Sequence, residues 1–236
     1  MLTHHVFENS SQLADHAAAL IARQAREAIR ARGRFVLALS GGKTPGPTYE
    51  RLARARGQAF RIDWGRTHVL WSDERGVAPD DSRANVAAAR AALFNRICVP
   101  ESNLHPMSSG PSIIDGADAY EIMVRTLLGS HGRIDLILLG LGADGHVASL
   151  FPSHQALQED VRWILPVHAP ATPPWRITMT LPLIRQARHI LFLIAGENKR
   201  AALANWMENR EVPAARVSAG VEDVTVLLDR DADPTG

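Results

Sequence analysis

Cysteine is nearly absent from this chain of 236 residues, and Cys98 is its only representative. One cysteine excludes an intrachain disulfide framework and any zinc site that needs a CxxC pair. The thiol is flanked by Ile97, Val99 and Pro100, with no polar group beside it that could activate it. We therefore predict that Cys98 is a buried structural residue.

Long hydrophobic runs and excess charge of either sign are also missing. The apolar run at residues 134–141 is far shorter than the roughly 20 residues that span a bilayer. Residues 1–10 have neither the cationic nor the apolar region of a signal peptide, so we expect a cytoplasmic protein without a membrane partner. With 26 basic and 25 acidic residues, the net charge is +1, so the chain lacks the excess of positive charge that is typical of nucleic-acid-binding proteins. Any anion must therefore be bound locally, by a few converging residues.

What the chain does have is a regular alternation of helical and strand patterns. Apolar residues recur every three or four positions in the helical segments, whereas the strand segments are short and often apolar on both faces. This order predicts one Rossmann-like α/β domain over residues 1–236, with a largely parallel central sheet and helices on both faces. The predicted helices are residues 11–32, 82–97, 116–128 and 197–209, with another through residues 49–53, and the predicted strands are residues 34–39, 67–72, 134–139, 162–167, 176–180, 189–194 and 224–228.

A glycine-rich loop follows the first predicted strand. It contains Gly41, Gly42, Lys43 and Thr44 and leads into a helix, whose unpaired N–H groups can hold an anion. This arrangement predicts a phosphate cradle. A Walker A loop would need a further glycine where Leu37 stands within the strand, which argues against a nucleoside triphosphate. The simpler alternative is a turn with Lys43 in solvent.

A second glycine-rich loop, at residues 140–152, follows another strand. Its glycines formally match the dinucleotide pattern GxGxxG, but Pro152 comes too early for the required helix. The loop also carries Asp144 and His146 at the carboxyl end of the strand, where ligands bind in open α/β sheets. His146 could deprotonate water while Asp144 orients its ring. Alternatively, Asp144 caps a turn and His146 packs under the sheet.

Further charged residues are predicted near the same edge of the sheet. Asp73 and Arg75 follow a strand, Arg176 opens one, and Lys199 lies in the first turn of a predicted helix, where a bound anion would offset its unfavourable position. Each could instead be an exposed surface charge. The remaining histidines show no metal-ligand spacing on any predicted helix, so no metal site is expected.

Taken together, residues 40–45, 73–75, 140–152, 176–182 and 196–199 resemble the 6-phosphogluconolactonase family in order and spacing. The resemblance implies hydrolysis of 6-phospho-D-glucono-1,5-lactone to 6-phosphogluconate, a step of the oxidative pentose phosphate pathway. It implies His146 and Asp144 as catalytic residues, with no cofactor. The substrate would be bound by residues of the loops described above: Gly41, Gly42, Lys43, Thr44, Asp73, Arg75, Arg176 and Lys199.

Two alternatives stay open. Glucosamine-6-phosphate deaminase has a similar Asp-Gly-His loop, but it has a glutamate seven residues after the aspartate, where this chain has Phe151. Since lactone hydrolysis needs fewer proton-transfer groups than deamination, Phe151 favours hydrolysis. A non-catalytic sugar-phosphate sensor would need a DNA-binding module, and the residues before the first predicted strand supply only one helix. The expected assembly is a monomer or a weak homo-oligomer.

Overall fold

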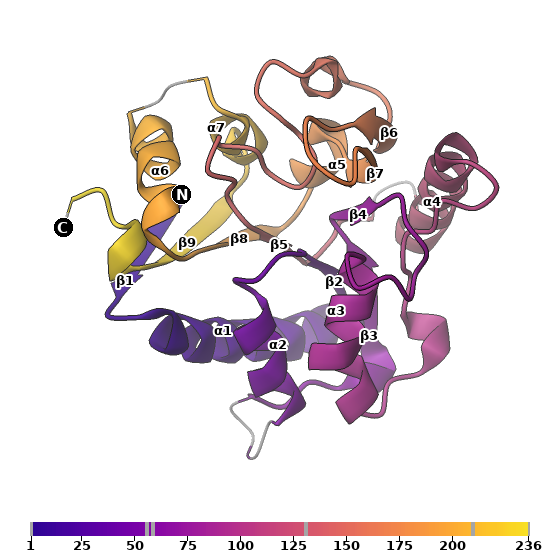
Figure 1. Ribbon diagram of the computed structural model, residues 1–236. Coiled ribbons are helices and arrows are strands. Elements are labelled where there is room, and N and C mark those ends of the chain that lie inside the picture. Colours follow the sequence, from indigo (N-terminus) through magenta and orange to yellow (C-terminus); the bar gives the residue numbers. More distant parts are fainter. Residues whose placement is uncertain (1, 55–56, 58–59, 130–131, 209–210, 236) are drawn as a thin grey trace.

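The computed structural model, which describes residues 2–54, 57, 60–129, 132–208 and 211–235, has a central sheet of parallel strands (Figure 1). Its strand order is β1-β9-β8-β5-β2-β3, and every neighbouring pair is parallel. The predicted parallel α/β architecture is therefore confirmed. The strands in sheet order are β1 (Leu2–Phe7), β9 (Asp223–Asp229), β8 (His189–Ile194), β5 (Leu136–Leu139), β2 (Phe35–Leu39) and β3 (Thr67–Trp71).

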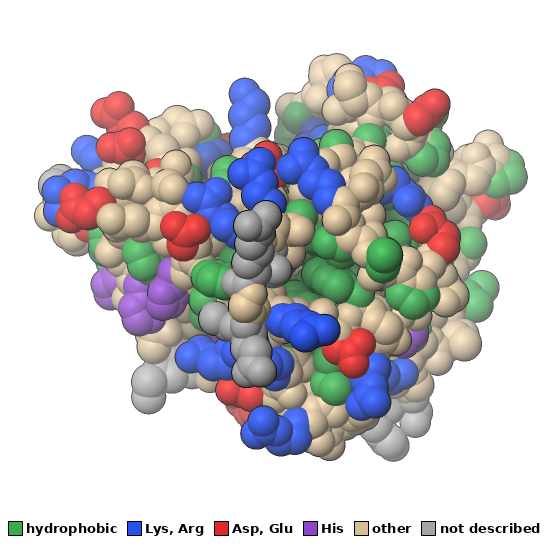
Figure 2. All heavy atoms as spheres, turned by 90° about the horizontal axis from the view of Figure 1, so that it is seen from below, with side chains coloured by type: hydrophobic (Ala, Val, Ile, Leu, Met, Phe, Trp, Pro, Cys, Tyr) green, Lys and Arg blue, Asp and Glu red, His purple; other side chains and the backbone are tan. Residues whose placement is uncertain are grey.

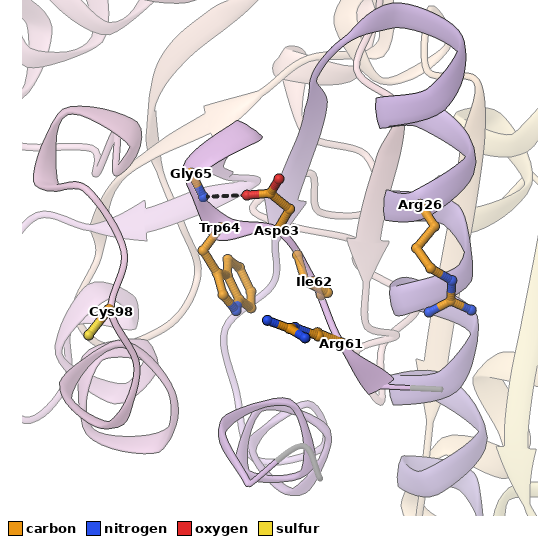
Figure 3. A pocket seen from close by; sticks show the side chains of 7 residues that line it. All are labelled: Arg26, Arg61, Ile62, Asp63, Trp64, Gly65 and Cys98. Atoms are coloured by element: carbon orange, nitrogen blue, oxygen red, sulfur yellow. Dashed lines mark hydrogen bonds between the residues drawn. The ribbon is translucent and has the colours of Figure 1, made fainter. Parts of the chain in front are cut away.

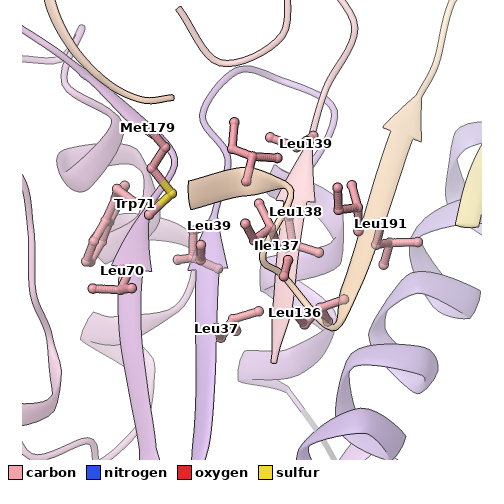
Figure 4. Close-up of a cluster of buried hydrophobic side chains, with 14 of the residues drawn as sticks. Leu37, Leu39, Leu70, Trp71, Leu136, Ile137, Leu138, Leu139, Met179 and Leu191 are labelled. Atoms are coloured by element: carbon pink, nitrogen blue, oxygen red, sulfur yellow. The ribbon is translucent and has the colours of Figure 1, made fainter. Parts of the chain in front are cut away.

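The middle of this sheet is hydrophobic on both faces because helices cover both. All residues of β2, β5 and β8 are buried. In Figure 4, leucine and isoleucine side chains from these neighbouring strands fill the space between the layers. Figure 1 shows α1 and α2 below the sheet and α6 and α7 above it. The helices are α1 (Ser10–Arg32), α2 (Gly46–Ala53), α3 (Asn85–Ala92), α4 (Ile113–Leu128), α5 (Leu181–Ile184), α6 (Arg200–Met207) and α7 (Pro213–Ser218).

Helix α1 shows how local sequence sets the element boundaries. The Asn9 side chain accepts hydrogen bonds from the backbone N–H groups of Ser11 and Gln12, so Asn9 is the N-cap. The helix therefore begins at Ser10, one residue before the predicted start. Gly33 ends the helix in the left-handed conformation, with φ of 77°. The buried stripe of α1, which includes Leu13, Ala17 and Ile21, faces the core.

A second sheet was not predicted as a separate unit. Strands β4 (Asp73–Arg75), β7 (Trp175–Met179) and β6 (Ile164–His168) form an antiparallel sheet in the order β4-β7-β6. It joins the central sheet through Ser72, whose carbonyl accepts a hydrogen bond of 2.8 Å from the Met179 N–H. This junction places Asp73, Arg75 and Arg176 beside the carboxyl end of β3.

Several predicted boundaries differ from the structure. The edge strand β1 was missed because its side chains are largely exposed and lack a clear apolar alternation. The helix predicted at residues 82–97 is shorter, since residues before Asn85 form turns and a 3-10 turn (Phe94–Arg96) follows it. The helix predicted from Glu197 begins with a 3-10 turn (Glu197–Lys199) before α6, and its predicted last residue, Asn209, lies outside the described residues.

None of the helices in the described ranges combines the length and apolar character that crossing a membrane requires.

Candidate active site

The two glycine-rich loops meet where the strand order reverses. Strand β2 pairs with β3 on one side and with β5 on the other, so the loops after β2 and β5 flank the switch point at which open α/β sheets bind ligands. A cavity of about 200 Å³ lies there. Its lining residues are Ser40, Gly41, Gly42, Lys43, Thr44, Pro45, Asp73, Arg75, Gly140, Leu141, Gly142, Ala143, His146, Ala148, Arg176 and Lys199.

The structure thus brings the predicted site residues together. Nine of the ten line the cavity, and the tenth, Asp144, is hydrogen-bonded to His146, which lines it. They come from five separate parts of the chain: the loops after β2 and β5, strands β4 and β7, and the 3-10 turn before α6. A site of this kind depends on the sheet topology, because no two of these parts are close in sequence.

His146 and Asp144 form a close pair. The His146 Nδ1 lies 2.6 Å from the Asp144 Oδ1, which also accepts a hydrogen bond of 3.2 Å from the His146 backbone N–H. Gly142 leaves room for the pair, since a Cβ there would lie 2.1 Å from the His146 Nδ1. The alternative in which His146 packs under the sheet is wrong, because its side chain is 31% exposed and lines the cavity. Asp144 does stabilise the turn, as that alternative proposed, through the backbone contact.

The electrostatics of this pair extend to Lys199. Partial burial would raise the pKa of Asp144, but the charge and hydrogen bonds of His146 outweigh it and hold that pKa below its usual value. Partial burial lowers the pKa of Lys199, and the negative charge of Asp144 opposes this change. Lys199 therefore lies within electrostatic range of the pair.

The loop after β2 is held by two side chains before any ligand binds. The Tyr49 hydroxyl donates to the Ser40 carbonyl at 2.7 Å and accepts from the Ser40 N–H at 3.2 Å. Burial raises the pKa of Tyr49, so the hydroxyl keeps its proton. Asn85 touches the loop so closely that a Cβ on Gly41 would lie 1.9 Å from its Oδ1. Gly42 has φ of 89°, which favours glycine, and Lys43 is exposed at the rim.

Asp73 is buried among hydrogen-bond donors. Its Oδ2 accepts from the Ser149 Oγ at 2.7 Å and lies 4.0 Å from the Arg176 Nη1, whereas its Oδ1 accepts from the Asn85 Nδ2 at 3.2 Å. Asp73 is 5% exposed and Arg176 7%, so the reading of these two as surface charges is wrong. Burial lowers the pKa of Arg176, and the negative charge of Asp73 opposes this effect.

Glu74 is a structural carboxylate that the sequence analysis missed. It accepts backbone hydrogen bonds from Arg75, Asn85 and Val86, at 2.7, 2.7 and 2.8 Å. It thereby joins β4 to the start of α3 and fixes Asn85 beside Asp73. Burial raises the pKa of Glu74, while these hydrogen bonds oppose the rise. No local pattern predicts this cap, because its acceptor lies eleven residues before the helix.

A larger hollow, of about 850 Å³, lies away from these motifs (Figure 3). Trp64 and Gly65 directly precede β3, so this hollow is at the amino edge of the sheet, and its lining residues include no histidine. Cys98 lines it and is exposed, which makes the prediction of a buried thiol wrong. The backbone is extended at Ile97, so Ile97 and Val99 pack on the core while Cys98 between them points outward.

Charge on the molecular surface is mixed where it can be seen. On the face in Figure 2, acidic side chains lie among the basic ones, and a hollow on that face exposes hydrophobic side chains. Among the described residues, no group of three or more histidine, cysteine, aspartate or glutamate side chains is arranged to hold a metal ion.

Comparison with known proteins identifies the family of this chain. The family described as glucosamine-6-phosphate isomerases/6-phosphogluconolactonase matches residues 8–226. A 6-phosphogluconolactonase of Synechocystis sp. is 41% identical over 203 residues, which cover 84% of this chain and 82% of that protein.

Solved structures show the same fold. The structure of 6-phosphogluconolactonase from Thermotoga maritima has a TM-score of 0.87 and 26% identity, and the match covers 98% of this chain and 100% of that one. A monomeric glucosamine-6-phosphate deaminase, at a TM-score of 0.83 and 24% identity over 98% of both chains, shares the fold. The chain therefore belongs to the glucosamine-6-phosphate isomerase/6-phosphogluconolactonase family.

Proposed function

We propose that this chain hydrolyses 6-phospho-D-glucono-1,5-lactone to 6-phosphogluconate, with His146 as general base. The observation that carries the proposal is the hydrogen-bonded pair of Asp144 and His146 at the rim of a cavity lined by cationic side chains and glycine-loop backbone. Relatives with 6-phosphogluconolactonase names, such as that of Synechocystis sp., support the choice of substrate. For a protein in this metabolic role, a cytoplasmic location is the expected one.

The hydrogen bond to Asp144 favours one tautomer of the His146 imidazole. When the His146 Nδ1 donates its proton to the carboxylate, Nε2 is left unprotonated and can accept a proton. His146 would remove a proton from water as the water oxygen attacks the lactone carbonyl carbon. The resulting imidazolium is stabilised by Asp144, and it then returns the proton to the ring oxygen as the C–O bond breaks. The products are the free hydroxyl and the acid, which loses its own proton to solvent.

The cationic groups divide between the two ends of the substrate. Lys199 feels the charge of Asp144, so we place its ammonium near the reacting carbonyl, where negative charge develops on oxygen. The backbone of Gly41 and Gly42, with Thr44, Lys43 and Arg75, would bind the 6-phosphate. Arg176 faces Asp73 and would position that carboxylate at the cavity wall.

The deaminase alternative is disfavoured by Phe151. This ring is 3% exposed, and its centroid lies 4.5 Å from that of His146 and 5.8 Å from the Arg176 guanidinium carbon. An apolar ring therefore stands where the deaminase pattern has a glutamate. A phenyl group cannot accept or deliver the protons that ring opening and amine release require.

The direct test is hydrolysis of freshly generated 6-phosphogluconolactone, followed by NMR against the spontaneous reaction. We expect the wild type to be active and His146→Ala to lose about 10² to 10⁴ in kcat while remaining folded. His5→Ala is the matched control, because His5 lies on the exposed edge strand β1. Wild-type hydrolysis at the background rate, together with release of ammonia from glucosamine 6-phosphate, would replace the proposal with the deaminase. Near-normal turnover by His146→Ala would remove the proposed base.

A further inference from the structure

A second cluster of cationic residues lies at the amino edge of the central sheet, opposite the candidate active site. A hollow of about 340 Å³ opens there, beside the start of β2 and just before β5 and β8. Of the seven described residues that line it, four are arginines and one, Asp135, is acidic. The lining residues are Arg32, Arg34, Val36, Gly132, Arg133, Asp135 and Arg188. From this geometry we propose a second ligand site, which binds a doubly charged phosphate group.

The Asp135 carboxylate already contacts groups of this chain. It is 5% exposed, and its Oδ1 lies 2.7 Å from the Arg32 Nη2 and 3.4 Å from the Arg188 Nε. Its Oδ2 accepts a hydrogen bond of 2.8 Å from the Val36 N–H. One carboxylate thus stands against four guanidinium groups, so the lining residues carry a net charge of +3. A dianion would neutralise most of this excess.

The four arginines differ in the hydrogen bonds and ion pairs that they make with the rest of the protein. Arg133 is fixed by donating to the carbonyls of Gln186 and Ala187, at 2.7 and 3.1 Å. By contrast, the Arg34 side chain makes no hydrogen bond or ion pair with any residue that the structure describes. The buried Arg188 Nε forms an ion pair with Asp135 at 3.4 Å but makes no hydrogen bond with the described residues. Leaving a buried donor without an acceptor costs free energy. A phosphate offers several acceptor oxygens, and guanidinium groups bind them in bidentate geometry.

The purely structural explanation accounts for only part of the cluster. Arg32 lies in the last turn of α1, where a cation stabilises the negative end of the helix dipole. Arg32 is also paired with Asp135, and Arg133 with loop carbonyls. Neither role extends to Arg34, which follows the helix end at Gly33. The volume of the hollow falls in the range of small-molecule sites, so it can hold a phosphate with a small organic group attached.

The proposed site is separate from the catalytic one. Arg34 precedes β2, whereas the glycine loop with Gly41 and Gly42 follows it. Five strand residues at about 3.3 Å each place the two ends about 17 Å apart. Binding at one end can therefore be measured independently of binding at the other, and independently of whether the chain is a lactonase.

The test is a titration of the ¹⁵N-labelled full chain with inorganic phosphate at constant ionic strength, followed by amide NMR. We expect saturable shifts at residues 34–36 and 133–136, with a binding curve distinct from that at residues 41–44. Arg34→Gln should weaken phosphate binding at the amino edge at least fivefold and leave the curve at residues 41–44 unchanged. Arg34→Lys should be intermediate, since it keeps the charge without the planar fork.

Arg96→Gln is the matched control, because Arg96 is an exposed arginine of the 3-10 turn after α3 and should change neither curve. A parallel titration with glucose 6-phosphate identifies the source of the phosphate group. Tighter binding than inorganic phosphate would indicate a phosphomonoester, and the reverse would indicate free phosphate. Absence of a saturable shift at residues 34–36 and 133–136, or an unchanged curve in a folded Arg34→Gln protein, would overturn the proposal.

Discussion

The two ends of the central strands hold buried carboxylates in different ways. At the carboxyl edge, Asp73 is held mainly by neutral donors, from Ser149 and Asn85, with Arg176 at 4.0 Å. At the amino edge, Asp135 is held by two arginines and one backbone N–H. Both aspartates are 5% exposed, so the contrast lies in the partners and not in burial.

This contrast bears on what each edge can do. Neutral donors supply the hydrogen bonds of the Asp73 carboxylate. The cationic side chains of Lys43, Arg75 and Lys199 therefore stay available for an anionic substrate. Cationic partners of Asp135 tie the end of α1 to the strand region before β5 and β8, which stabilises the fold. We therefore expect substitutions at the carboxyl edge to reduce catalysis, and substitutions at Asp135 to reduce stability with little effect on catalysis.

The largest expected effect comes from Gly142→Ala. A Cβ there would lie 2.1 Å from the His146 Nδ1 and 2.5 Å from the Asp144 Oδ1, so both side chains must move apart. We expect kcat/KM for lactone hydrolysis to fall about 10² to 10⁴, as for loss of the base. The fold should survive, because the displaced atoms belong to partly exposed side chains.

Gly46→Ala is the control for this change. A Cβ on Gly46 meets no atom within 4 Å, and the residue lies at the start of α2. Steady-state kinetics should therefore show a loss of kcat/KM in Gly142→Ala and not in Gly46→Ala. Thermal unfolding should show that both variants are folded. Equal activities would mean that the close pair is not needed for turnover.

The next effect is on stability and concerns Asp135→Ala. The substitution leaves Arg32 and Arg188 without their carboxylate and the Val36 N–H without its acceptor. Because these arginines are partly exposed, we expect a loss of about 2 to 3 kcal/mol in the free energy of unfolding, measured with urea. Activity per folded molecule should stay near the wild-type value.

A matched ion pair on the surface sharpens this result. Asp15→Ala removes the carboxylate that Arg51 contacts at 2.6 Å, but Asp15 is 58% exposed. The expected loss is below about 1 kcal/mol. If Asp135→Ala cost no more than Asp15→Ala, the amino-edge network would have no special structural role.

A smaller change is expected for Ser149→Ala. It deletes the 2.7 Å hydrogen bond to the Asp73 Oδ2 in a fully buried position. The expected destabilisation is about 1.5 kcal/mol, accompanied by a severalfold loss of kcat/KM as the Asp73 carboxylate loses its orientation. Ser218→Ala, which removes hydrogen bonds only to carbonyls within α7, should leave kcat/KM unchanged. Matching kinetic losses in the two variants would contradict a positioning role for Ser149.

The smallest effect concerns pH and Lys199. Partial burial lowers the pKa of this ammonium below the usual 10.5, so its charge is present at low pH and is lost as pH rises through the lowered value. Binding of 6-phosphogluconate, measured by calorimetry, should therefore weaken on the alkaline side. Lys199→Arg keeps its charge over this range and should abolish that weakening. An identical alkaline limb in Lys199→Arg would assign the titration to another group.

The order of elements could be predicted because buried parallel strands and amphipathic helices leave strong local patterns. Strand β8 (His189–Ile194), for example, was predicted at its observed bounds. The antiparallel sheet β4-β7-β6 could not be predicted in this way. Its strands are three to five residues long, and their pairing depends on partners about 10 to 100 positions away. Edge strand β1 was hidden because an exposed strand needs no apolar alternation.

At the site, the sequence predicted which residues lie close together but not which contacts hold them in place. Strand ends and glycines indicated the loops that carry Lys43 and His146, since the ends of parallel strands share one edge. The partners of Asp73, by contrast, come from Ser149 and Asn85, two residue types with no distinguishing local pattern. The arginines around Asp135 lie in three separate segments, and only the folded sheet makes them neighbours.

The double hydrogen bond between Tyr49 and Ser40 has a thermodynamic consequence. One hydroxyl satisfies both the N–H and the C=O of Ser40, much as an adjacent strand would, although here the partner is a helix side chain. The first residue of the glycine loop is thus ordered by folding itself, and the loss of its backbone entropy does not recur when a ligand arrives. In calorimetric terms, anion binding at this loop should carry a small conformational entropy penalty, and Tyr49→Phe should increase that penalty.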